Sequence, residues 1–172
     1  IFFSIIPDIL NAEKGFKSEN IFPIASSRSE GMKVSFGESE IVVSSLEKFN
    51  PKEIQIALFS AGGEISKEWA PKFANAGCIV IDNSSHFRMD PDVPLIVPEV
   101  NADALSGYKK KNIIANPNCS TAQLLVALKP LHDINTIKRV IVSTYQSVSG
   151  AGKEGMDELF NQSRKFFAND VL

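Results

Sequence analysis

The chain has 172 residues, 44% of them hydrophobic, and a formal net charge of −2 at pH 7. This length suits one domain, or one domain and part of another, and the balanced charge argues against a nucleic-acid partner or an anionic membrane surface. No apolar run approaches the roughly 20 residues of a membrane-spanning helix. Two cysteines are too few for a disulfide framework. We therefore expect a cytoplasmic protein with no nucleic-acid or membrane partner, and the sequence predicts no metal site.

Strand-like and helix-like segments alternate along the chain. Helices are expected over residues 5–14, 65–76 and 153–167 and from Cys119 onward, and strands over 21–25, 33–36, 41–44, 54–59, 78–82, 113–115 and 139–145. The second and third strands read as a hairpin around Gly37-Glu38, and the fourth reads as buried. Pro71 is unfavourable in the middle of its helix. Continuous β-branched runs between helices predict an α/β fold with a largely parallel sheet covered on both faces.

Small or polar residues follow four of the expected strands, at the carboxyl ends where parallel sheets bind ligands. These segments are residues 25–29, 60–63, 82–85 and 116–119. In the first, Arg28 among serines suits the 2′-phosphate of NADP, although a solvated loop charge explains it equally well. In the second, Gly62 and Gly63 allow close approach of a cofactor to the backbone, but a helix-entry turn needs the same glycines.

The fourth segment, Asn116-Pro117-Asn118-Cys119, carries the strongest chemical signal. An apolar strand ends there, and the spacing of Leu124, Leu125, Leu128 and Leu131 predicts a helix that Asn118 caps. Cys119 then lies in the first helical turn, where the helix dipole favours thiolate, the reactive form of cysteine. The free N–H groups of that turn can also stabilise an oxyanion. The alternative is a buried structural cysteine, which is how we interpret Cys78.

The sequence resembles the bacterial type of aspartate-semialdehyde dehydrogenase. The matching segments are ASSRS at 25–29, ALFSAGG at 57–63, VIDNSSHFRMDPDVPLIVPEVN at 80–101, NIIANPNCST at 112–121, LKPLHD at 128–133 and VSTYQSVSGAGKEGMDEL at 142–159. The resemblance implies reduction of L-aspartyl 4-phosphate by NADPH to L-aspartate 4-semialdehyde and phosphate. In cells this reaction leads to lysine, threonine, methionine and diaminopimelate. It also implies a homodimer for the whole protein.

The resemblance further implies roles for individual residues. Cys119 matches the nucleophile that forms an acyl-thioester, Gln146 the glutamine that holds the substrate beside the thiol, and Arg88 the arginine that receives the substrate phosphate. Asn118 is expected to add a hydrogen bond to that phosphate. The cofactor-binding positions implied are Ser26, Arg28, Ser29, Ser60, Gly62, Ser149 and Gly150. Without the resemblance, Gln146 reads as a strand-end amide, and Arg88 as a surface charge paired with Asp90 or Asp92.

The chain also departs from the family pattern. It begins without methionine, after the point where the family has its first strand and glycine-rich phosphate loop, so we expect a fragment. The family's acid–base histidine and carboxylate-binding arginine are not matched, and neither His86 nor His132 replaces the histidine. We expect residues 1–118 to be most of a Rossmann-like NADP-binding domain that lacks its first strand. Residues 119–172 would begin an α+β catalytic and dimerisation domain.

Two other functions stay open at this stage. An N-acetyl-glutamyl-phosphate reductase would use the same thioester chemistry, although residues 26–29 and 145–152 match it less well. A truncated, inactive product would act only by associating with other chains through its exposed catalytic-domain helices, and missing strands would leave unpaired sheet edges that favour aggregation.

Overall fold

The computed structural model describes residues 15–168 of the chain, which divide into two compact units between Asp133 and Ile134. The expected helix over 5–14 lies outside the described residues. The strands are β1 (Ile24–Ala25), β2 (Lys33–Phe36), β3 (Ser39–Val42), β4 (Ser44–Ser45), β5 (Ile56–Phe59), β6 (Ile79–Asp82) and β7 (Ile113–Ala115). The α-helices are α2 (Gly63–Asn75), α3 (Pro98–Asn101), α4 (Cys119–Ile134) and α5 (Gly152–Phe167). Short 3-10 helices are η1 (Ser18–Asn20), η2 (Ser27–Ser29), η3 (Pro51–Glu53), η4 (Ala102–Lys110) and η5 (Val148–Ala151).

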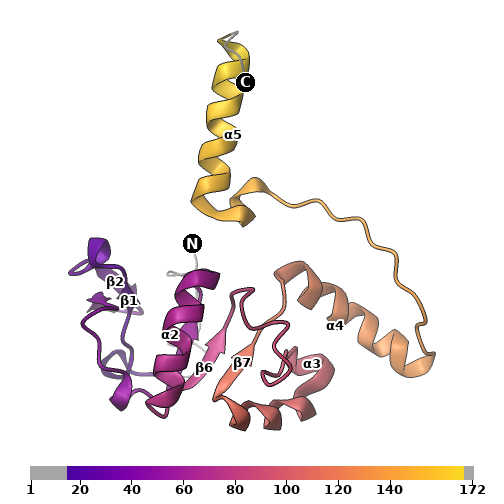
Figure 1. Ribbon diagram of the computed structural model, residues 1–172, viewed down its shortest axis with the longest axis horizontal. Helices are drawn as coiled ribbons and strands as arrows, with labels where there is room; N and C mark the ends of the chain where they lie inside the picture. The colour runs from indigo at the N-terminus through magenta and orange to yellow at the C-terminus, as the bar shows by residue number, and fades with distance from the viewer. Residues whose placement is uncertain (1–14, 169–172) are drawn as a thin grey trace. The chain divides into compact units, whose positions relative to one another are not determined.

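The first unit is organised around a parallel sheet in the order β5-β6-β7. In register, Phe59 lies opposite Asp82, and Asp82 lies opposite Ala115, so the three strands end together. Helix α2 connects β5 to β6 and packs against both strands (Figure 1). This strand–helix–strand arrangement confirms the α/β prediction, because parallel neighbours need a crossover of this kind.

The core lies between α2 and the sheet. Phe73 of α2 is buried against Phe59 of β5, with ring centroids 5.2 Å apart in an edge-to-face arrangement. On its other side Phe73 stacks on Phe49 at 6.2 Å, and this contact attaches the segment after β4 to the core. Cys78 and Val80 are buried in the same cluster, as the sequence predicted for Cys78. Helix α2 runs continuously through Pro71.

Two smaller sheets complete the strands of this unit. Strands β2 and β3 form the predicted antiparallel hairpin, with Phe36 opposite Ser39 and only Gly37-Glu38 between them. Gly37 has a φ of 58°, the left-handed conformation that so tight a turn requires. Because this turn is short, the second arm begins earlier than the expected residue 41. Strands β1 and β4 pair in parallel, and the expected strand over 21–25 is reduced to its last two residues.

Two strand predictions need correction. The strand over 54–59 was expected to be buried, but Ile56 is 55% exposed and Leu58 is half-exposed, because β5 is the edge strand of the sheet among the described residues. The strand over 139–145 does not form. That segment pairs with no strand in the part of the chain that the structure describes, and Tyr145 is 102% exposed. A strand needs a ladder partner, and local β-propensity does not supply one.

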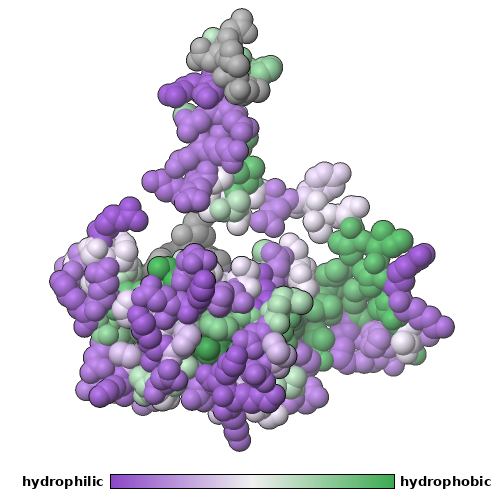
Figure 2. All heavy atoms as spheres, in the orientation of Figure 1, coloured by the Kyte–Doolittle hydropathy of each residue, from purple (hydrophilic) through white to green (hydrophobic). Residues whose placement is uncertain are grey.

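The helices around residue 119 and after residue 152 form where the sequence predicts them. Helix α4 begins at Cys119, and its apolar residues include the exposed Val126, Leu131 and Ile134 (Figure 2). In the second unit, η5 leads directly into α5, and these two elements contact each other extensively. No helix of the described residues is long and apolar enough to cross a membrane.

Candidate active site at the sheet edge

The carboxyl ends of β5, β6 and β7 form one continuous edge. The Asn83 amide donates to the Phe59 carbonyl at 2.8 Å, and the Asn116 amide donates to the Asp82 carbonyl at 2.8 Å. Backbone pairing therefore continues one residue past each ladder and brings three of the four predicted polar segments together. The remaining polar segment, residues 25–29, follows β1 in a separate two-stranded sheet. This is the edge at which open parallel sheets bind ligands.

Cys119 is the first residue of α4 and its thiol-bearing side chain is exposed. The Asn118 Oδ1 atom accepts a hydrogen bond from the Ser120 amide at 2.9 Å, and the Asn118 carbonyl accepts from Ala122 at 3.0 Å. These bonds confirm Asn118 as the helix cap. The buried ring of Pro117 fixes the chain just before it. Cys119 is thus held in a helical first turn whose N–H groups point out of the helix end.

The two cysteines differ sharply in environment. Cys78 is 0% exposed, and burial raises the pKa of its thiol from 9.0 to about 11. Its sulfur has only a weak contact with the Ile79 carbonyl, at 3.7 Å. Cys78 is therefore protonated and inaccessible near neutral pH, and Cys119 is the accessible thiol of the described chain.

Arg88 is attached to the backbone of the sheet edge. Its Nε atom donates to the Asn116 carbonyl at 2.8 Å, and its Nη2 atom donates to the Asn83 carbonyl at 3.1 Å. A guanidinium has five N–H donors, so three stay available to a ligand. Because Asn116 lies three residues before Cys119 in the sequence, Arg88 and the thiol are positioned from the same end of β7.

The alternative in which Arg88 pairs with a neighbouring aspartate is wrong. Asp90 forms an ion pair with Lys111 at 2.7 Å, and Asp92 forms one with Lys110 at 3.0 Å. The hydrogen bond from Lys111 lowers the pKa of the Asp90 carboxyl below its usual value. These ion pairs connect the segment after Arg88 to the segment before β7. The Arg88 guanidinium therefore bonds to the carbonyls at the strand ends and not to these aspartates.

The predicted nucleotide-binding residues of the first unit lie on two exposed turns. Gly62 has a φ of 95°, and a Cβ added there would meet nothing within 4 Å, so the backbone before α2 is open to a ligand. Ser60 is also exposed. In the other turn, the exposed Ser26 precedes η2, which contains Arg28 and Ser29. Arg28 forms no ion pair with another described residue.

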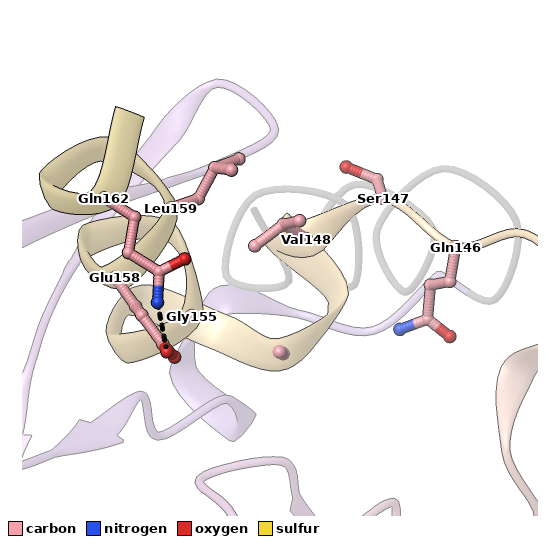
Figure 3. A pocket seen from close by; sticks show the side chains of 8 residues that line it. Gln146, Ser147, Val148, Gly155, Glu158, Leu159 and Gln162 are labelled. Carbon is pink, nitrogen blue, oxygen red and sulfur yellow. Dashed lines mark hydrogen bonds between the residues drawn. The ribbon is translucent and has the colours of Figure 1, made fainter. Parts of the chain in front are cut away.

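Gln146, Ser149 and Gly150 belong to the second unit and surround the turn before α5. Gln146 lines a hollow of about 430 Å³ together with Ser147, Val148 and residues of α5 (Figure 3). The Gly150 amide donates to the Ser147 carbonyl at 2.9 Å. A Cβ added at Gly150 would lie 2.8 Å from Cδ of Gln146 and 3.1 Å from its Cγ, so the Gln146 side chain rests directly on the glycine.

Sequence reasoning missed the buried environment of Asp82. The segment 82–85 was recognised only as a polar strand end, but the Asp82 carboxylate is fully buried and bonded to both Ser66 and Ser84. The available signal was an aspartate that directly follows the apolar run Ile79-Val80-Ile81, where a further apolar residue would continue the core.

Comparisons with known proteins agree with the resemblance. The family model "Semialdehyde dehydrogenase, NAD binding domain" matches residues 8–108, and "Semialdehyde dehydrogenase, dimerisation domain" matches residues 128–172. Aspartate-semialdehyde dehydrogenase 2 of Vibrio cholerae is 55% identical over 153 residues, which cover 89% of this chain and 45% of that protein. The enzyme of Aquifex aeolicus is 58% identical over 153 residues, or 88% of this chain and 45% of the relative.

Solved structures give the same result. Aspartate semialdehyde dehydrogenase II of Vibrio cholerae, complexed with ASA, superposes with a TM-score of 0.83 at 49% identity, over 98% of this chain and 50% of that one. The Candida albicans enzyme with NADP gives a TM-score of 0.59 at 29% identity, over 76% and 43% of the two chains. The chain thus spans about half the length of the relatives it matches. With a family model matched over more than half of its residues, the chain belongs to the semialdehyde dehydrogenase family.

Proposed function

We propose that this chain supplies the nucleophile and most of the cofactor-binding domain of an aspartate-semialdehyde dehydrogenase. The enzyme would reduce L-aspartyl 4-phosphate with NADPH to L-aspartate 4-semialdehyde and phosphate. The observation that carries the proposal is the exposed Cys119 at the start of α4, beside a strand edge to which Arg88 is bonded. Relatives more than 50% identical to the chain carry this enzyme's name, which favours it over the N-acetyl-glutamyl-phosphate reductase alternative.

In the proposed reaction, the Cys119 thiolate attacks the carbonyl carbon of the acyl phosphate. A C–S bond forms, the C–O bond to phosphate breaks, and phosphate leaves with the bonding electrons. The N–H groups at the start of α4 stabilise the negative charge that develops on the carbonyl oxygen. NADPH, when bound, would supply the hydride that adds to the thioester carbonyl carbon. The C–S bond would then break, with its electrons returning to Cys119 as thiolate, and the aldehyde would leave.

Arg88 would receive the substrate phosphate. Two of its donors are committed to the Asn116 and Asn83 carbonyls, so the guanidinium plane is fixed before the ligand arrives. The remaining donors match the fork geometry that phosphate oxygens accept. Asn118 uses Oδ1 to cap α4, and its Nδ2 group keeps two donors for the same phosphate.

The exposed turns of the first unit fit a phosphorylated dinucleotide. The open backbone at Gly62 precedes a 13-residue helix, whose N-terminus attracts phosphate groups, and Ser60 adds a hydroxyl there. Arg28, with the hydroxyls of Ser26 and Ser29, would hold the 2′-phosphate that distinguishes NADP from NAD. In the second unit, Ser149 and Gly150 would contact the nicotinamide half, and Gln146 would hold the substrate beside the thiol.

The remaining expectations stay predictions. These are the domain boundary after residue 118, the homodimer and the cytoplasmic location. The match of residues 128–172 to a dimerisation domain supports the homodimer. Two free cysteines are consistent with a reducing compartment.

The test is a reverse-direction assay on the whole enzyme. NADP reduction should require both L-aspartate 4-semialdehyde and inorganic phosphate. Cys119→Ser should abolish it, because a hydroxyl is a far weaker nucleophile than a thiolate, and Cys78→Ser should retain it. Phosphate-independent reduction, or full activity of the Cys119→Ser protein, would refute the proposal.

A further inference from the structure

Asp82, the last residue of β6, is a buried carboxylate for which the proposed reaction has no role. Its side chain is 0% exposed, and it follows Val80 on the face of β6 that packs against α2. A carboxylate that gives up its hydration needs hydrogen-bond donors in return. The donors that surround Asp82 show what it holds together.

Both oxygens of Asp82 are occupied. Oδ1 accepts from Ser66 Oγ at 2.7 Å and from the Ser84 amide at 3.1 Å. Oδ2 accepts from Ser84 Oγ at 2.7 Å. The Ser84 hydroxyl also accepts from the His86 amide at 3.2 Å, so its single proton is committed to Asp82. Ser66 and Ser84 are buried as well, so the network lies in the interior of the first unit.

The two arms of the network lead to different parts of the site. Ser66 lies in the first turn of α2, where its amide donates to the Gly62 carbonyl at 3.1 Å. This arm fixes the turn proposed to face the nucleotide. Ser84 belongs to the segment that carries Arg88, which is bonded to the carbonyl of the adjacent Asn83. This second arm fixes the side proposed to bind phosphate.

The two turns also touch directly. A Cβ added at Gly63 would lie 3.7 Å from Ser85 Oγ and 4.0 Å from the His86 Cβ, so the start of α2 packs against the segment after β6. A displacement of the Gly62 turn would therefore displace the segment after β6 as well. Asp82 connects the two from the buried side.

We propose that Asp82 is a positioning residue that locks the Gly62 turn and the Arg88 segment into one arrangement. The proposal rests on the function proposed above, and it adds that the nucleotide and phosphate sides of the site are set jointly by this carboxylate. An apolar residue at position 82 could fill the space as Val80 does, but it would offer neither turn an acceptor. Fully satisfied buried networks of this kind specify a single local geometry.

The experiment uses the whole enzyme in the reverse direction, with separate titrations of inorganic phosphate and NADP. Asp82→Asn places an amide NH₂ against Ser84 Oγ, whose proton then loses its acceptor. We expect KM to rise about tenfold for phosphate and for NADP, with kcat changed less than about threefold. Ser84→Ala and Ser66→Ala should each raise both KM values, with the larger rise for phosphate in Ser84→Ala and for NADP in Ser66→Ala.

Val80→Ala is the matched control, because it loosens the same β6–α2 packing without removing a hydrogen bond. It should lower Tm and leave both KM values within about twofold of the unaltered enzyme. If Asp82→Asn behaves like this control, with a lower Tm and unchanged KM values, the positioning role is refuted and the network only stabilises the fold.

Hydrogen exchange separates failure of this inference from failure of the proposed function. If the unaltered enzyme shows no phosphate-dependent reduction of NADP, the proposed function falls. The coupling of the two turns through Asp82 can then be tested without an activity assay. If Asp82 couples them, Ser66→Ala should speed hydrogen exchange of the Ser84 and His86 amides severalfold. Unchanged exchange at those amides would refute the coupling.

Discussion

Alkylation should separate the two cysteines of this chain by a large factor. The perturbation is a timed exposure of the folded chain to iodoacetamide at pH 8. Burial raises the pKa of Cys78 to about 11, so about one Cys78 thiol in a thousand is ionised at that pH. Only the thiolate reacts, and Cys78 is 0% exposed, so the reagent must also wait for local opening. Because Cys119 is exposed at a helix end, we expect it to react at least about 100-fold faster.

The assay is mass spectrometry of peptides from samples quenched at successive times. Cys119→Ser should remove the fast phase completely, and Cys78→Ala should leave it unchanged. Because the reagent reaches Cys78 only after local opening, where the thiol has an ordinary cysteine pKa, Cys78 labelling should accelerate severalfold between pH 8 and pH 9. In denaturant the two cysteines should react at similar rates. Equal rates in the folded chain, or faster labelling of Cys78, would refute the assignment of Cys119 as the accessible nucleophile.

Substitutions at four further positions test the proposed site and the fold. In the whole enzyme, Arg28→Ala should raise KM for NADP and leave KM for NAD nearly unchanged; equal losses would mean that Arg28 does not bind the 2′-phosphate. Arg88→Ala should weaken phosphate binding by about 2–3 kcal/mol, and Arg88→Lys should recover only part, in a phosphate titration. Gly150→Ala should displace the Gln146 side chain and raise KM for aspartate semialdehyde, with KM for phosphate as the internal comparison. Ser45→Ala should raise the free energy of unfolding, measured by urea denaturation, by about 1 kcal/mol. The reason is that the hydroxyl of this buried serine has no hydrogen-bond partner among the described residues. A decrease would contradict that geometry.

The parts of the fold that sequence reasoning predicted well are those with local causes. The Gly37-Glu38 hairpin, the strand at β6 and the helix start at Cys119 follow from turn residues, β-branched runs and an asparagine cap. The strand expected over 139–145 failed because its apolar pattern needs a partner that the described residues do not provide. The exposure of Ile56 and Leu58 has the same origin, since burial of a strand depends on its neighbours in the sheet.

The candidate site divides in the same way. Cys119 could be identified because its reactivity depends on the residues next to it in the chain. The contacts of Arg88 could not be predicted, since its acceptors, the Asn83 and Asn116 carbonyls, become neighbours only when β6 and β7 pair. From the local sequence, an ion pair between Arg88 and Asp90 was the natural expectation. Asp90 instead pairs with Lys111, which lies 21 residues further along the chain. The Asp82 network is equally non-local, because Ser66 reaches it from α2.

The way in which Arg88 is held bears directly on what the sheet edge can do. A guanidinium on a free side chain loses rotamer entropy when it binds phosphate, and that loss weakens binding. Here folding has already ordered the side chain, because two backbone carbonyls hold it at the ends of β6 and β7. The same β7 end continues through Asn116 to the Asn118 cap and Cys119. In the proposed reaction, a cation and a nucleophile that share one backbone support would keep their spacing as a property of the sheet register, which is the preorganisation that acyl-phosphate chemistry requires.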